Sequence, residues 1–233
     1  MDGGVKNNSC DRVSFCSCFC FSQTDEEHLS GIEKYFDNFN ILRKKDRWEE
    51  IISLGTKALE SAQEMGKKKE QAKICAQLTS VNFYQGNYLQ ALEFVSRCHL
   101  MSEEFEDPTL FIRALYLESA IYRAFAGKST QDQERQQLYL QAVQAAEEAA
   151  RSYSKSKLNN LKLLGKIYFN LGAAHADNPK GSLDQAEVSY LTAMQSFKSV
   201  NEIDDFVRAD IRLAKVYVIQ KKYEAAQEIL NEI

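Results

Sequence analysis

Proline, histidine and long apolar runs are all scarce in this sequence. Only 2 of the 233 residues are proline and 10 are glycine, while alanine, leucine, glutamate, glutamine and lysine dominate the middle of the chain. This composition favours helix throughout. No apolar run approaches the roughly 20 residues that cross a bilayer as a helix. The net charge of −4 provides no broad basic surface, so we expect no nucleic-acid partner.

The few histidines show no pattern typical of a catalytic or metal site. They are His28, His99 and His175, and none belongs to a His-Glu-x-x-His pair. No serine or cysteine stands in a nucleophile elbow. A phosphate loop at "AGKST", Ala126 to Thr130, is excluded because Tyr122 stands where the first glycine belongs and the preceding stretch has a helical pattern. We therefore expect no enzyme activity, no cofactor and no metal.

The cysteines divide unevenly along the chain. Cys10, Cys16, Cys18 and Cys20 crowd the N-terminus, whereas Cys75 and Cys98 lie inside helical patterns. A secreted disulfide framework would spread its cysteines through the fold, so we expect reduced thiols and a cytoplasmic protein.

The N-terminal cysteines leave two interpretations open. Zinc is disfavoured because Cys16, Cys18 and Cys20 alternate singly, with no matching second pair. Cysteines clustered among phenylalanines resemble S-acylation sites, which would hold the protein at the cytoplasmic face of a membrane. The alternative is a flexible tail with incidental thiols, because acylation has no strict motif.

Two distant segments align without a gap. These are "LTSVNFYQGNYLQALEF", Leu78 to Phe94, and "LAKVYVIQKKYEAAQEI", Leu213 to Ile229. The same corner, usually an aromatic residue three positions before a small one, recurs at Trp48 and Ile51, Tyr88 and Ala91, Tyr139 and Ala142, Leu183 and Ala186, and Tyr223 and Ala226. Successive corners lie 40 (48 to 88), 51 (88 to 139), 44 (139 to 183) and 40 (183 to 223) residues apart. This period predicts an all-α fold, a right-handed α-solenoid of about five helical hairpins.

The chain divides into a tail and a repeat domain. Residues 1–28 lack a helical period and are predicted to be a flexible cysteine-rich tail, and residues 29–233 form the repeat domain. Ile229, Leu230 and Ile233 would face a neighbour beyond the last hairpin. We therefore expect the repeats to continue past residue 233 or to be covered there by a partner.

The repeats resemble the tetratricopeptide family. "YFNLGAAH", Tyr168 to His175, followed by Ala186, Tyr190 and Ala193, is the best copy of that pattern. The repeats here are longer than the family standard, and Phe39 stands where a small residue is expected. In this family the first helices of the hairpins line a concave groove that binds peptides or helices. The resemblance implies these groove residues: Lys73, Ala76, Ser80, Phe83, Lys166, Asn170, Ala173, Arg208, Ile211, Arg212 and Lys215.

Arg208 and Arg212 are the most specific of these candidates. They lie four residues apart, on one helical face, and guanidinium groups suit the bidentate binding of carboxylates. With Asn170 they match part of a family clamp for acidic C-terminal tails, although Tyr116 and Ala120 occupy the clamp positions of the third hairpin. The other interpretation is a solvated surface, because Asp205 lies three residues before Arg208.

The sequence as a whole predicts a binding protein. We expect a scaffold or adaptor that holds an acidic or amphipathic segment of a partner protein in the groove. One alternative is a membrane-tethered adaptor with an S-acylated tail, and another is a secretion chaperone built from similar repeats.

Overall fold

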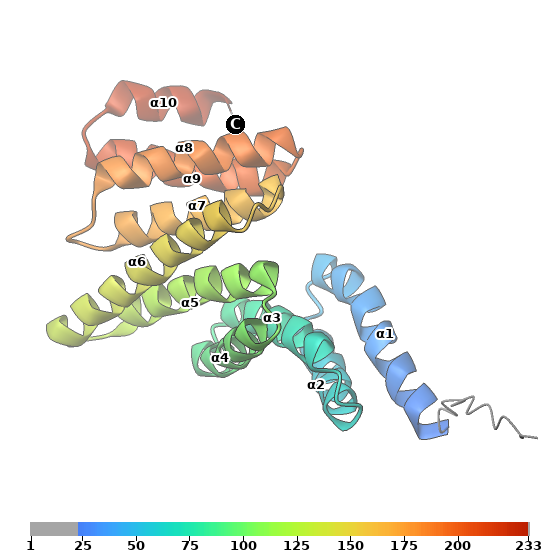
Figure 1. Ribbon diagram of the computed structural model, residues 1–233. Helices are drawn as coiled ribbons and strands as arrows, with labels where there is room; N and C mark the ends of the chain where they lie inside the picture. The colour runs from blue at the N-terminus through green and yellow to red at the C-terminus, as the bar shows by residue number, and fades with distance from the viewer. Residues whose placement is uncertain (1–22, 233) are drawn as a thin grey trace, which may run out of the picture.

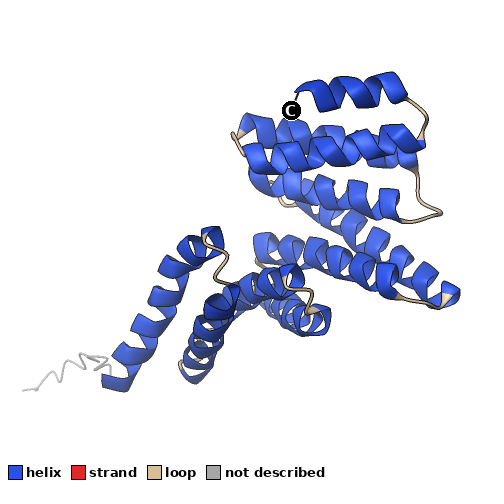
Figure 2. Cartoon of the chain, turned by 180° about the vertical axis from the view of Figure 1, so that it is seen from behind, coloured by secondary structure: helices blue, strands red, loops and turns tan. Residues whose placement is uncertain are grey.

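The computed structural model describes residues 23–232, and all regular structure within them is helical. The helices are α1 (Gln23–Lys44), α2 (Trp48–Glu64), α3 (Lys68–Tyr84), α4 (Tyr88–Glu104), α5 (Pro108–Lys128), α6 (Asp132–Lys155), α7 (Leu161–Asp177), α8 (Leu183–Ser199), α9 (Ile203–Ile219) and α10 (Tyr223–Glu232). Figure 2 shows helices joined by short loops over this range. The prediction of an all-α solenoid of about five helical hairpins is confirmed.

One tight turn recurs along the chain and ends most of the helices. The second residue before the next helix has a positive φ at Asp46, Gly66, Gly86, Glu106, Asn201 and Lys221. In the second of these turns the amide of Lys67 donates to the carbonyl of Ala62, and in the third the amide of Asn87 donates to the carbonyl of Asn82. These bonds satisfy carbonyls that the helix end leaves free. Four of the five predicted corner residues, Trp48, Tyr88, Leu183 and Tyr223, are the first residues of helices, whereas Tyr139 lies within α6.

The first helix starts earlier than the sequence indicated. Helix α1 begins at Gln23, so the last residues of the predicted tail, 23–28, are helical. His28 in this segment bonds Ser61 of α2 at 3.1 Å and lies 2.9 Å from the carboxylate of Glu64. The rest of the tail, including Cys16, Cys18 and Cys20, lies outside the described residues.

The helices form two layers. Each helix packs against its neighbours in sequence, and α5 also contacts α3 and α7, while α7 also contacts α9. Helices α1, α3, α5, α7 and α9 are the first helices of the five hairpins, and the even-numbered helices are the second helices (Figure 1). The first helices therefore form a continuous inner layer from α3 to α9.

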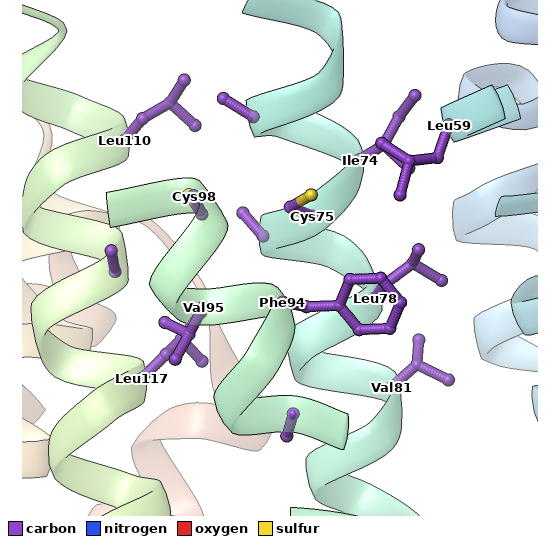
Figure 3. Packing of buried hydrophobic residues seen from close by; sticks show 14 of the residues in the cluster. Leu59, Ile74, Cys75, Leu78, Val81, Phe94, Val95, Cys98, Leu110 and Leu117 are labelled. Atoms are coloured by element: carbon purple, nitrogen blue, oxygen red, sulfur yellow. The ribbon is translucent and has the colours of Figure 1, made fainter. Parts of the chain in front are cut away.

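The core of the N-terminal half is aliphatic. Leu78 of α3 and Val95 of α4 are fully buried, and Figure 3 shows them between the neighbouring helices with Leu117 of α5. Cys75 and Cys98 lie in the same core and are free thiols. Burial raises the pKa of Cys75 to about 11 and that of Cys98 to about 12, so both stay protonated at neutral pH. Within residues 23–232, no helix is both long and apolar enough to cross a membrane.

Candidate functional site

Two adjoining hollows lie on the inner layer of first helices. The first hollow, which we call the central cavity, has a volume of about 190 Å³. It is lined by side chains of α1, α3, α5, α7 and α9, together with Trp48 and Phe197 from second helices. A second hollow of about 350 Å³, the C-terminal hollow, lies between α5, α7 and α9. Arg123, Phe169 and Arg208 line both, so the two hollows are parts of one groove.

The central cavity is strongly basic. Its positively charged lining residues are Arg43, Arg113, Arg123, Lys166 and Arg208. Among the described residues that line it, Asp205 is the one acidic side chain. The whole chain carries a net charge of −4, so this concentration of positive charge departs from the average composition. A charged cleft of this kind attracts ligands of the opposite sign.

Two of these cations already have acidic partners inside the protein. Arg208 lies 3.4 Å from Asp205, one turn earlier on α9. Arg123 Nη1 donates to Asp177 at 2.7 Å, and its Nη2 donates to the Asn170 amide oxygen at 3.2 Å. Both residues are therefore at least partly neutralised without a ligand.

Three cations of the central cavity have no such partner. Arg43, Arg113 and Lys166 form no ion pair with any described residue. The Nε of Arg113 is buried and has no hydrogen-bond acceptor. Burial lowers the pKa of Lys166, and the nearby charges of Arg113 and Arg43 lower it further, against the opposing effect of Asp205. The folded protein therefore gathers several like charges around one cavity, where Asp205 is the one acidic side chain among the described lining residues.

Aromatic rings line the same cavity. Trp48 and Tyr84 have ring centroids 6.1 Å apart, and Tyr84 and Phe83 are 5.8 Å apart. Tyr84 is 52% exposed. Phe169 and Tyr116 extend the aromatic surface on α7 and α5. The groove thus offers cations and flat apolar surfaces side by side.

A shared carboxylate fixes the C-terminal hollow. Asp177, at the end of α7, accepts from Arg123 of α5 and, at 2.8 Å, from Arg212 of α9. Arg212 Nε also donates to the hydroxyl of Tyr190 on α8, at 3.1 Å. This network joins four helices of three hairpins, and it occupies the Arg212 guanidinium.

The structure brings most of the predicted groove residues together. Ser80, Phe83, Lys166, Asn170 and Arg208 line the central cavity, while Ile211 and Arg212 line the C-terminal hollow. Lys73 and Lys215 are exposed and line neither hollow. Tyr116 and Ala120 do face the central cavity, as the repeat alignment placed them.

The guanidinium groups of Arg208 and Arg212, which were predicted to bind a ligand, are already bonded within the protein. Arg208 pairs with Asp205, as the solvated-surface interpretation expected, and Arg212 is bonded to Asp177 and Tyr190. Sequence reasoning instead missed Arg43, Arg113 and Arg123. A signal for the last two was present, because Arg113, Tyr116, Ala120 and Arg123 recur at the spacing of one helix face.

The described residues offer no metal site. Within residues 23–232, no group of three or more histidine, cysteine, aspartate or glutamate side chains converges as metal ligands would. The N-terminal cysteines lie outside this range, so their acylation stays a prediction.

Comparisons with known proteins bear on the fold. No family model matches this sequence, and no curated protein matches it either. Among solved structures, the chain is similar to the crystal structure of BtubC (BKLC) from P. vanneervenii, with a TM-score of 0.61 and 16% sequence identity. The match covers 91% of this chain and 90% of that one. At this identity the likeness concerns the fold alone, and it shows that the chain is a helical-repeat protein.

Proposed function

We propose that this chain is a binding scaffold of the tetratricopeptide type. Its concave groove holds an acidic segment of a partner protein that also carries aromatic or aliphatic side chains. The observation that carries this proposal is the set of unpaired cations Arg43, Arg113 and Lys166 beside the aromatic wall of the central cavity. The proposal includes no catalytic step.

Electrostatics supports an acidic ligand. Arg113 and Lys166 are half-buried and form no ion pair with a described residue, which destabilises the free protein because burial removes water and the charges repel each other. Carboxylates of a bound segment would offset both effects and would select against basic partners. The aromatic surfaces of Trp48, Phe83 and Tyr84 would supply apolar contact area.

The packing of the repeated corners supports the tetratricopeptide assignment. The small residues of that pattern, Ala91, Ala142, Ala186 and Ala226, are all at most 3% exposed. Ala91, Ala186 and Ala226 lie in the first turn of α4, α8 and α10, and Ala142 lies further along α6. Their small size lets two helices approach closely. These are the positions that the family pattern reserves for alanine.

A peptide-display selection on the full chain tests the proposal. We expect selected peptides to be enriched in aspartate and glutamate together with aromatic residues. The groove variant Arg43→Gln, Arg113→Gln, Lys166→Gln should bind those peptides at least about tenfold more weakly, a loss of about 1.4 kcal/mol. Circular dichroism and thermal melting would first establish that the variant is folded.

A control variant removes the same positive charge elsewhere. Lys57→Gln, Lys155→Gln, Lys198→Gln changes exposed lysines on α2, α6 and α8. It should bind the selected peptides as the wild type does. Selection of basic peptides, or equal losses in the two variants, would refute a specific role for the groove.

A further inference from the structure

We propose that the central cavity recognises a phosphorylated side chain, so that the acidic segment bound by the groove carries a phosphate monoester at this point. This inference rests on the proposed function and names the ligand group of the same site. It follows from the charge, the donors and the size of the cavity.

The charge of the cavity exceeds what one carboxylate can balance. Arg43, Arg113 and Lys166 form no ion pair with a described residue, and Asp205, which pairs with Arg208, is the one acidic side chain among the described residues that line the cavity. A single carboxylate carries one negative charge, whereas a phosphate monoester carries about −1.5 to −2 at pH 7. The dianion therefore matches this cluster more closely than aspartate or glutamate does.

The available donors also suit a phosphoryl group. Arg113 contributes a buried Nε with no acceptor, and Lys166 contributes an ammonium group on the neighbouring first helix, α7. A phosphoryl group presents three acceptor oxygens, which can bind donors from several directions at once. Arginine groups around an anion of this kind are a recurrent means of recognising phosphorylated segments. Because the donors come from α1, α5 and α7, only the assembled repeats can present them together.

The central cavity on its own is smaller than a typical site for a free metabolite. Sites for small molecules and cofactors typically measure about 300–1,000 Å³. The central cavity measures about 190 Å³ and continues into the C-terminal hollow. The central cavity alone has room for one charged group, and the adjoining hollow of about 350 Å³ gives the rest of a polypeptide ligand space to extend along the groove. The adjoining rings of Tyr84 and Trp48 provide a surface for the residues that flank the phosphorylated position.

The test compares three degenerate peptide libraries on the full chain. All have seven residues with a fixed centre, which is phosphoserine in the first, glutamate in the second and serine in the third. Binding is measured by fluorescence polarisation at fixed ionic strength. We expect the phosphoserine library to bind at least about tenfold more tightly than the glutamate library. Arg113→Gln should abolish this preference, and Arg113→Lys should keep only part of it.

The outcomes separate this inference from the proposed function. If glutamate and phosphoserine libraries bind equally and the groove variant loses both, the acidic-segment function holds and phosphate recognition is overturned. If no library binds, both are overturned. Thermal stabilisation by inorganic phosphate without binding of phosphoserine peptides would overturn the inference in favour of a small-molecule anion. Phosphoserine binding that survives in the groove variant but not in the control variant would also overturn it.

Discussion

Gly165 of α7 sets how closely that helix approaches α8. A Cβ at this position would lie 2.6 Å from Cε1 and 2.7 Å from Cδ1 of Phe197, a ring that is 2% exposed. Phe197 also lines the central cavity. The absence of a side chain at Gly165 therefore determines both the packing of the fourth hairpin and the position of one cavity wall.

Replacement of this glycine should destabilise the fold. Alanine gains up to about 1 kcal/mol of helix propensity, but overpacking against a buried ring costs about 1–3 kcal/mol. We expect Gly165→Ala to lower the free energy of unfolding by about 1–2 kcal/mol in urea titrations. Gly127→Ala is the matched control, because a Cβ there meets nothing within 4 Å. That substitution should stabilise the protein by about 0.5–1 kcal/mol, and a loss there would contradict the packing argument.

Removal of the charge of Lys166 should make the protein more stable but weaken its binding of acidic peptides. Burial of the Lys166 ammonium lowers its pKa; the charge of Asp205 opposes this effect, and the charges of Arg113, Lys162 and Arg43 add to it. Lys166→Met keeps the length of the side chain and removes the charge, so we expect it to raise the free energy of unfolding by on the order of 1 kcal/mol. The same change should weaken the binding of acidic peptides to the groove. Lys57→Met, at an exposed position on α2, should alter stability by less than about 0.5 kcal/mol and leave binding unchanged.

At the scale of helices, His99 joins α4 to α5. Its Nδ1 lies 2.8 Å from Glu118 Oε1, and its ring packs against Phe111 with centroids 5.0 Å apart. The hydrogen bond to Glu118 raises the pKa of His99, helped by the charges of Glu103 on α4 and Glu148 on α6 and opposed by burial. The protonated imidazole therefore stabilises the contact between the second and third hairpins.

This contact predicts a pH dependence of stability. A histidine with a raised pKa in the folded state contributes stability below its unfolded pKa of about 6.5. That contribution is lost as the pH rises through the folded pKa. Glu118→Gln should therefore cost more stability at about pH 6 than at about pH 9. Chemical denaturation of both proteins at the two pH values measures the difference, and an equal cost at both would exclude the ion pair.

A second histidine, His175, should change the pH dependence of stability in the opposite direction and so serves as a control. Burial lowers the pKa of His175. A lowered folded pKa makes stability fall as the pH drops through the ordinary range of histidine. His175→Gln should therefore remove a loss of stability at low pH, whereas Glu118→Gln removes a gain.

Helix boundaries were predictable from the sequence because their causes are local. Gly66 and Gly86 supply the positive φ that their turns require, and alanines such as Ala91 mark where a second helix begins. The composition of the groove was less predictable, because it depends on which faces of distant helices meet. Arg43 and Arg113 line one cavity only because the second hairpin stacks between the first and the third. The commitment of Arg212 to Asp177 likewise joins residues that no local pattern links.

At the scale of the whole molecule, charge is separated between the groove and the rest of the surface. A protein of net charge −4 concentrates five cations around one cavity. An acidic ligand of the proposed kind would therefore be attracted mainly at this cavity, which would favour a single binding register. Helices α1, α5 and α7, which carry Arg43, Arg113, Arg123 and Lys166, each bury their other face in one apolar core, and this packing holds the cationic positions in place.

The Asp177 network has a mechanical consequence. In an array of hairpins each unit contacts mainly its neighbours, so the array can bend between units. The bonds of Asp177 to Arg123 and Arg212 act as a brace across α5, α7 and α9, whereas α1 packs chiefly against α2. The part of the solenoid that contains α5, α7 and α9 should therefore be rigid, and α1 should be the more mobile part. Arg43 lies on α1, so closure around a ligand would consist mainly of a movement of this arginine toward the cations on α5 and α7.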